Sequence, residues 1–134
     1  MSNSIINEVI QLHQFFEAWL AGSLTKSRET YQRFESVMAE DFGMIPPDSE
    51  LLPREVITDI IWQEHGAKAP SFKIEIRNPS VRKLTEALYL ASYEEWQFDS
   101  EPTARIATAL MKEEPSGIRW LHVHESWLPQ APAN

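Results

Sequence analysis

The spacing of apolar residues changes once along the chain, from a helical period to strict alternation. In the first half, apolar side chains recur every three to four positions, the spacing that buries one face of an α-helix. The predicted helices cover residues 5–21, residues 28–39 and a third segment that starts at Pro53 and ends at Gly66. Ser4 is the expected cap of the first helix and Gly22 its expected end, because serine accepts helical N–H groups and glycine adopts a left-handed backbone.

From residue 70 onward, apolar and polar residues alternate with a period of two, as they do in half-buried β-strands. The predicted long strands cover residues 72–84 with a kink at Asn78-Pro79, 87–98, 104–112 and 118–128, and a tail follows from Pro129. Two short strands, residues 41–45 and 51–52, flank a turn before the third helix. Helices followed by a run of strands predict an α+β fold, with three N-terminal helices packed on a mainly antiparallel sheet.

The last strand, residues 118–128, carries bulky groups on both sides, so we expect it to lie in the centre of the sheet. One side of the extended chain carries Leu121, Val123, Glu125 and Trp127, and the other carries Trp120, His122 and His124. We predict that the side with Leu121 and Val123 faces the helices.

The strand over residues 87–98 becomes polar along one side, where Leu88 and Leu90 are followed by Ser92, Glu94 and Trp96. Two strands separated by one intervening antiparallel strand run in the same direction, so their polar ends meet at one edge. We therefore predict that Glu94, Trp96, Glu125 and Trp127 surround the mouth of a cavity between the sheet and the helices.

The opposite side of these two strands is rich in aromatic and imidazole groups, namely Tyr89, Tyr93, Trp120, His122 and His124. A large aromatic patch of this kind is poorly suited to open water and often marks a protein interface. We predict that the protein forms a homodimer through this face of the sheet.

Composition narrows the class of protein. The 134 residues, 43% of them hydrophobic, fit a single domain over residues 1–134. The net charge of −8 argues against a nucleic-acid partner. The absence of cysteine excludes disulfide and thiolate chemistry and is compatible with a reducing cytoplasm, where we expect the protein. No secretory signal or membrane span is expected, because no apolar run reaches about 18 residues.

Three segments resemble the NTF2-like superfamily in its SnoaL-like or DUF4440-like branch: A-E-D-F-G-M-I-P-P (residues 39–47), R-I-A-T-A-L-M (residues 105–111) and W-L-H-V-H-E-S (residues 120–126). The resemblance covers nearly the whole chain by the order of its elements. It implies a cone-shaped α+β barrel with a pocket at one end and dimers through the sheet.

Two departures from this superfamily limit what is carried over. Kinase association domains that share the H-x-H-x-S pattern have a basic residue where this chain has Glu125, so binding of an anion by that residue is not implied. Ketosteroid-isomerase relatives place a catalytic aspartate soon after the second helix, where this chain has Pro46. That catalytic base is therefore not expected here.

Glu94 and Glu125 are the candidate catalytic residues. Two carboxylates at an apolar cavity repel each other, which raises one pKa and creates a general acid or base. The alternative is that each is exposed at a strand end or paired with Arg105 or Arg119. His122 and His124 project to one face, but no third ligand accompanies them, so we expect interface histidines and no metal or cofactor.

Two functions follow as hypotheses. The first is a pocket for a small, mostly apolar ligand, with metal-free acid–base chemistry of the isomerase, dehydratase or cyclase type. Its expected ligand-binding residues are Trp19, Tyr31, Trp62, Ser92, Trp96 and Trp127, although ordinary core packing is the alternative for the aromatic ones. The second is a non-catalytic, dimeric assembly module. An open cavity of about 300 Å³ or more with convergent polar groups favours the first hypothesis, and a cavity closed by tryptophans favours the second.

Overall fold

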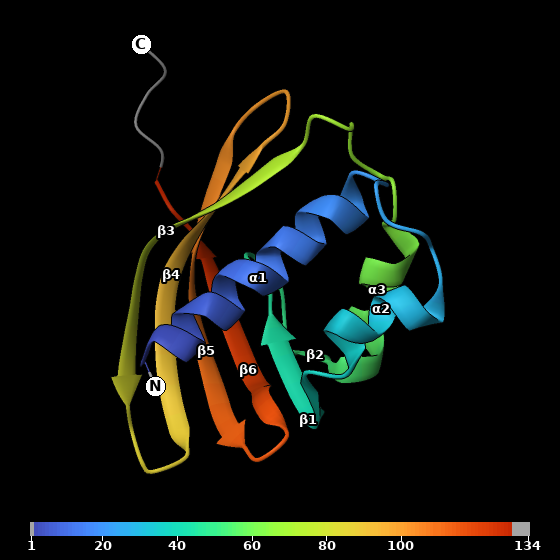
Figure 1. Ribbon diagram of the computed structural model, residues 1–134. Helices are drawn as coiled ribbons and strands as arrows, with labels where there is room; N and C mark the ends of the chain where they lie inside the picture. Colours follow the sequence, from blue (N-terminus) through green and yellow to red (C-terminus); the bar gives the residue numbers. More distant parts are fainter. Residues whose placement is uncertain (1, 130–134) are drawn as a thin grey trace.

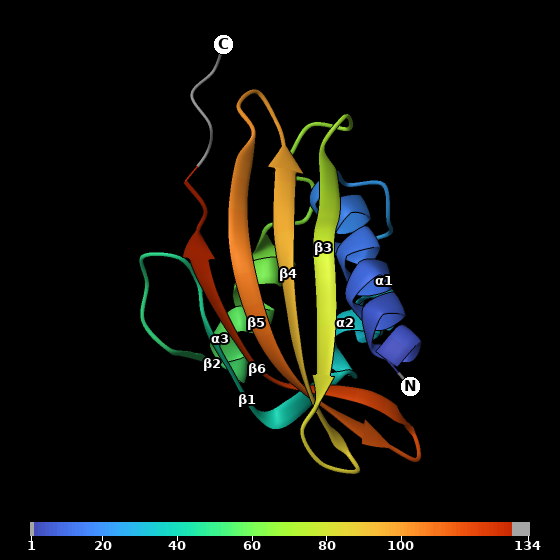
Figure 2. The same ribbon diagram turned by 90° about the vertical axis from the view of Figure 1, so that its left-hand side faces the viewer.

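Three helices lie against one face of a single curved sheet in the computed structural model, which describes residues 2–129. The helices are α1 (Ser2–Leu20), α2 (Arg28–Glu35) and α3 (Arg54–Gln63). The strands are β1 (Met38–Ile45), β2 (Leu52–Pro53), β3 (Lys73–Lys83), β4 (Leu88–Phe98), β5 (Thr103–Glu114) and β6 (Gly117–Trp127). Figures 1 and 2 show α1 crossing the inner face of the strands. The predicted tail begins at Pro129, and residues 130–134 lie outside the described part of the chain.

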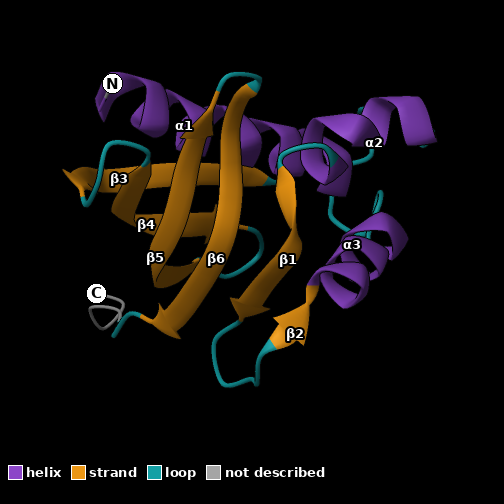
Figure 3. Ribbon diagram, turned by 90° about the horizontal axis from the view of Figure 1, so that it is seen from below, coloured by secondary structure: helices purple, strands orange, loops and turns teal. Residues whose placement is uncertain are grey.

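The sheet has six strands in the order β2-β1-β6-β5-β4-β3. The pairs β3–β4, β4–β5, β5–β6 and β1–β2 are antiparallel, and β1–β6 is parallel. The last strand therefore lies inside the sheet, between β1 and β5. The sheet curves without closing, and Figure 3 shows α2 and α3 beyond the β1–β2 edge. This arrangement confirms the predicted NTF2-like α+β fold. Within residues 2–129, no helix is long and apolar enough to cross a membrane.

The helix ends differ from the prediction in two places. The first helix starts at Ser2, so Ser4 lies inside it and the predicted cap is wrong. Its end is as expected, because Gly22 adopts a φ of 77° and the Ser23 N–H donates to the Ala18 carbonyl at 2.9 Å. The second helix ends at Glu35 because the following chain pairs with β6, where Met38 lies opposite Trp120. Strand pairing thus overrides local helical spacing.

Small residues on the inner face of the sheet allow the first helix to pack closely. Ala91, Ala107 and Ala109 are almost completely buried. Opposite them α1 presents an apolar stripe that includes Val9 and Leu12, both buried. A larger side chain at these sheet positions would force the helix outward, since interiors are close-packed.

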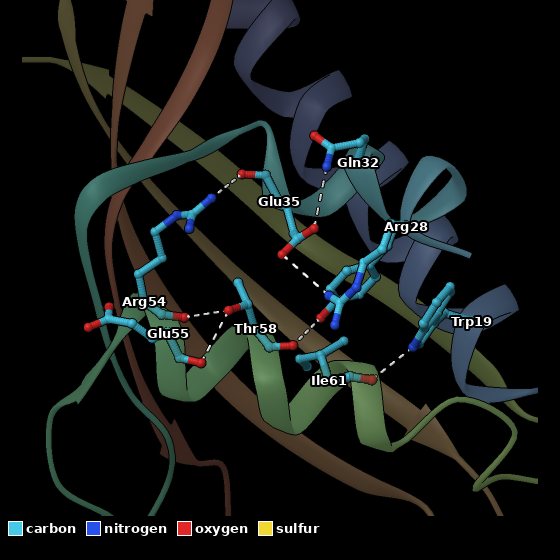
Figure 4. Close-up of polar contacts among 9 residues, drawn as sticks. Trp19, Arg28, Gln32, Glu35, Arg54, Glu55, Thr58 and Ile61 are labelled. Atoms are coloured by element: carbon cyan, nitrogen blue, oxygen red, sulfur yellow. Dashed lines mark hydrogen bonds and ion pairs between the residues drawn. The ribbon is translucent and has the colours of Figure 1, made fainter. Parts of the chain in front are cut away.

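Hydrogen bonds to backbone carbonyls tie the third helix to the first two, as Figure 4 shows. The Arg54 Nη2 donates to the Glu35 carbonyl at 2.7 Å, and the Trp19 Nε1 donates to the Ile61 carbonyl at 2.8 Å. The Tyr31 hydroxyl donates to the carbonyl of Thr58 at 2.6 Å. These bonds hold α3 beside the open edge of the sheet and so fix one wall of the space beneath it.

Candidate functional site

A bulge in the last strand determines which of its side chains point inward. Met111 lies opposite Trp120 and Leu110 lies opposite His122, so Leu121 is an extra residue in β6. Trp120, Val123 and Glu125 consequently face the helices and are buried, whereas His122 and His124 lie on the outer face. The prediction that Trp120 faces a partner subunit is wrong. A strict alternation cannot reveal a bulge, and the bulge shifts the face of every residue before it.

The faces of β4 are the reverse of those predicted. Tyr89, Ala91, Tyr93 and Glu95 are buried on the inner face. Leu88, Leu90, Ser92, Glu94 and Trp96 alternate with them on the outer face. Both sides of this strand contain apolar residues, so polarity alone did not distinguish them. The aromatic side faces inward because its rings and alanines fill the space under α1.

A cavity of about 310 Å³ lies between the helices and the inner face of the sheet. Its helical wall is apolar and includes Leu12, Phe16, Phe34, Ile57 and Ile61. Its sheet wall carries the polar residues Tyr93, Glu95, Gln97, Arg105 and Glu125, and α1 adds His13. A hollow of this size with a few convergent polar groups is typical of small-molecule sites.

His13 and Glu95 form a buried ion pair across the cavity. The His13 Nδ1 lies 2.7 Å from the Val9 carbonyl, which can only accept, so Nδ1 carries a proton. Its Nε2 lies 3.2 Å from Glu95 Oε1. Burial disfavours the charged imidazole, yet the Glu95 carboxylate raises the pKa of His13 above the usual value of 6.5. The raised pKa favours the doubly protonated imidazole, which donates at both nitrogens.

Glu95 keeps its charge in spite of burial. Burial on its own would raise the pKa of this carboxyl, but the His13 cation, Arg105 and a hydrogen bond from Gln97 outweigh it and lower the pKa to about 2. The Gln97 Nε2 donates to Glu95 Oε2 at 2.7 Å. Both carboxylate oxygens are thus committed to protein donors.

Glu125 behaves in the opposite way. Burial and the nearby Glu95 carboxylate raise the pKa of Glu125 to about 7, although Arg105 acts in the other direction. The Arg105 Nη1 donates to Glu125 Oε1 at 3.2 Å. This bond survives protonation because the carbonyl oxygen of a carboxylic acid still accepts, with the acid proton on Oε2. Near neutral pH, Glu125 can therefore either give or take a proton.

Of the two carboxyls predicted as a pair, only Glu125 lines the cavity. Glu94 lies on the outer face, where the Trp96 Nε1 and the Asn78 Nδ2 donate to it at 2.9 and 3.0 Å. These hydrogen bonds lower the pKa of Glu94. The predicted carboxyl pair is therefore replaced by Glu95 and Glu125. Arg105 pairs with Glu125, which agrees with the alternative that a carboxyl of the predicted pair is bound to an arginine.

The predicted ligand-binding residues do not line the cavity. Trp19 and Tyr31 are completely buried, and their rings pack at a tilt with centroids 4.7 Å apart. Trp62 packs beside them under Arg28. Ser92 and Trp96 are on the outer face. Trp127 is 45% exposed and donates from Nε1 to Asp48 at 2.8 Å. The predicted cavity lining by these six residues is wrong.

Two of the predicted interface residues besides Trp120 also face inward. Tyr89 and Tyr93 are 1% and 2% exposed, so neither is available to a partner on the outer face. The sequence analysis missed His13, Glu95 and Arg105 as site residues. His13 had a signal, because it follows Val9 by four residues in the apolar stripe of α1. Within residues 2–129, no group of three His, Cys, Asp or Glu residues could hold a metal ion.

Comparison with known sequences places residues 5–129 in the family described as sucrose-6-phosphate phosphohydrolase C-terminal. The chain is 24% identical over 129 residues to a probable sucrose-phosphatase 3a of Arabidopsis thaliana. The match covers 93% of this chain and 30% of that protein. The chain therefore spans about a third of the length of this curated relative.

Comparison with solved structures gives the fold. An NTF2-like protein of unknown function from Pseudomonas aeruginosa superposes with a TM-score of 0.85 at 23% identity, over 94% of this chain and 99% of that one. The CamKII hub homology domain of Chlamydomonas reinhardtii superposes with a TM-score of 0.70 at 16% identity, over 94% and 100% of the two chains. The chain has the NTF2-like fold and belongs to the sucrose-6-phosphate phosphohydrolase C-terminal family.

Proposed function

We propose that the cavity binds a small, mostly apolar ligand and that Glu125 exchanges a proton with it. One observation carries the proposal: two buried carboxyls, Glu95 and Glu125, share one cavity and have pKa values of about 2 and about 7. Neighbouring carboxyls whose environments separate their pKa values are the usual basis for dividing acid and base roles.

Each polar residue of the sheet wall has a role in this proposal. Glu125 is the general acid or base, because its pKa lies near neutral pH. Arg105 holds its Oε1, and Oε2 has no hydrogen-bond partner among the described residues. The groups that influence Glu125 are Glu95 from β4, Arg105 from β5 and His13 from α1. The His13–Glu95 pair keeps the second carboxyl ionised, and its charge keeps the Glu125 pKa high.

The reaction classes that fit are isomerisation, dehydration and cyclisation, in which a proton moves to or from carbon or a leaving hydroxyl. The apolar helical wall favours a ligand with little polar surface and limits water around the proton in transit. The relatives named for sucrose phosphate suggest a sugar as the competing ligand class. The apolar wall argues against a ligand that is polar on all sides.

The test begins with the ligand that co-purifies with the protein, identified by native mass spectrometry and compared with added sucrose and sucrose 6-phosphate. Turnover of the identified ligand is then measured for E125Q and for E94Q. We expect E125Q to lower the rate by about a hundredfold or more, because the proton donor is lost, and E94Q to leave it unchanged. Full activity in E125Q would contradict the proposal.

A second candidate is an assembly module that pairs through the outer face of the sheet. A row of side chains crosses that face, since Leu90 lies opposite Leu110 and Leu110 lies opposite His122. Ile106 on the same face is 42% exposed. The similarity to a kinase hub domain is compatible with such a role. Light scattering of I106E tests it, with a shift from dimer to monomer expected and an unchanged mass contradicting it.

Three further predictions from the sequence are kept as proposals: the SnoaL-like or DUF4440-like branch, the single domain over residues 1–134 and the cytoplasmic location. The branch rests on the three segments at residues 39–47, 105–111 and 120–126. Each is independent of the acid–base proposal, which depends only on the cavity.

A further inference from the structure

The polar wall of the cavity has more donors to offer than acceptors. Most of its acceptor oxygens are already bound within the protein. Glu95 Oε1 accepts from His13, Glu95 Oε2 accepts from Gln97, and Glu125 Oε1 accepts from Arg105. The indole N–H of Trp120 is also committed, to Glu8 at 3.0 Å.

Two N–H or O–H groups of the residues on this wall have no protein partner among the described residues. The Nε of Arg105 is buried without a hydrogen bond. The hydroxyl of Tyr93 makes none within residues 2–129, although this residue is only 2% exposed and lines the cavity. A buried donor without a partner costs about 1–3 kcal/mol, so the Arg105 Nε–H favours a ligand that satisfies it. The Tyr93 hydroxyl is a second donor available to the same ligand, because Tyr93 lines the cavity.

Protonation adds a third donor at the same wall. Burial raises the pKa of Tyr93 well above 10, so its hydroxyl keeps its proton. Burial and Glu95 raise the pKa of Glu125 to about 7, so near neutral pH a large fraction of this residue carries a proton on Oε2.

The cavity has three further polar lining residues. Gln97 contributes an amide oxygen, and Glu64 and Lys68 line the cavity from the end of α3 and the following loop. Lys68 is paired with Asp99 at 3.3 Å.

We infer that the cavity takes a ligand with an apolar body and one sp² oxygen, a ketone or a carboxylate, which accepts from Tyr93 and Arg105 beside Glu125. An amine is disfavoured beside Tyr93 and Arg105, because its N–H groups would meet the O–H and N–H groups of these two residues. The inference rests on the proposed ligand-binding function and adds the chemical class of the ligand. It also explains why Arg105 has an unused donor inside an otherwise satisfied network.

Four probes with one body but different polar ends test it: acetophenone, phenylacetate, 1-phenylethylamine and ethylbenzene. Binding is followed by ¹H–¹⁵N correlation spectra of the whole protein at about pH 6, where the Arg105 Nε–H gives its own signal and Glu125 is mostly protonated. We expect a ketone or carboxylate to bind about tenfold more tightly than the hydrocarbon and the amine, and to shift the Nε–H signal. Whichever of acetophenone and phenylacetate binds more tightly shows whether the cavity prefers a neutral carbonyl or a carboxylate.

Y93F removes one donor without changing the ring, and Y89F is its matched control. Tyr89 is buried on the same face of β4, but it does not line the cavity and its hydroxyl lies 3.3 Å from Glu113. We expect the preference for the oxygen probe over the hydrocarbon to fall by about fivefold to tenfold in Y93F and to stay unchanged in Y89F. Should Y93F keep the preference, or the amine bind as tightly as the ketone, the inferred ligand class is wrong and the pocket still stands.

The proposed function fails in a different way. If the oxygen probes are preferred and Y93F abolishes the preference, but E125Q retains full turnover of the natural ligand, then the ligand class is correct and the proton-transfer role of Glu125 is wrong. An Arg105 Nε–H signal that no probe shifts would contradict the inferred ligand class directly.

Discussion

Glu94 and Glu95 are neighbours in one strand and differ almost entirely in environment. Glu95 faces the cavity, is 6% exposed and belongs to a network with His13 and Arg105. Glu94 faces outward and binds only Trp96 and Asn78 at the surface. The lesson is that the face of the strand decides the chemistry, because burial makes each charge depend on the others.

The outer and inner faces of the sheet also differ in how charge is balanced. On the outer face, Arg77 stacks over Trp96 at 4.2 Å from the ring centroid and pairs with the exposed Glu75. Pairs of this kind contribute little, since water screens them. Under the inner face, the carboxyls of Glu95 and Glu125 interact with the cations of His13 and Arg105, so changing any one of these groups alters the protonation of the carboxyls.

The largest expected effect comes from removing one charge of the buried network. E95Q leaves the buried His13 imidazolium without its paired anion, and we expect the free energy of unfolding to fall by about 4 kcal/mol. Urea denaturation measures it. E94Q is the matched control one residue away, and we expect no measurable change. Equal losses in the two variants would contradict the difference between the faces.

The second effect is a dependence of stability on pH. The pKa of Glu125 is about 7 in the fold against 4.5 for the free side chain, so the folded state holds this proton more tightly. Proton binding at Glu125 stabilises the fold fully below about pH 4.5. This stabilisation is lost as the pH rises to about 7, which lowers the free energy of unfolding by roughly 3 kcal/mol. The pKa of His13 is also raised by Glu95, so the free energy of unfolding falls further as the pH rises through the pKa of His13 in the folded protein.

E125Q tests this dependence, because glutamine still accepts from Arg105 but does not titrate. We expect the stability of E125Q to fall much less than that of the wild-type protein between about pH 4.5 and pH 7, as measured by thermal or urea unfolding. A wild-type protein that becomes more stable over this range would show that Glu125 is ionised in the fold.

A smaller effect is expected from packing alone. Ala107 is completely buried against the helices, and its neighbour Thr108 faces outward. A107L should cost about 2 kcal/mol, because the added atoms must displace the core side chains around this position. T108L on the outer face should cost little, as judged by the same denaturation experiment. A reversed order would mean that the core does not lie on the Ala107 side of β5.

The sequence predicted the fold well because the fold depends on spacing. The helical and alternating periods located all three helices and the four long strands, and the order of elements indicated the NTF2-like fold. Element ends were less accurate. The second helix stops at Glu35 because Met38 pairs with Trp120, a contact that joins residues far apart in the sequence.

The site was less accessible from the sequence, for two physical reasons. The bulge at Leu121 reversed the face of Trp120, and the two apolar sides of β4 could not be ranked without knowing where α1 lies. Glu125 was placed on the correct side because it follows the bulge. His13 was missed because its partner Glu95 lies 82 positions later, and only the fold brings the two together.

A pH titration of the glutamate side-chain carboxyl ¹³C signals, assigned with E125Q, E95Q and E94Q, tests the central claim most directly. We expect a midpoint of about 7 for Glu125 in the wild-type protein, a lower midpoint for Glu125 in E95Q, and a midpoint below 4.5 for Glu94. A Glu125 signal that titrates at or below 4.5, or that does not respond to E95Q, would contradict it.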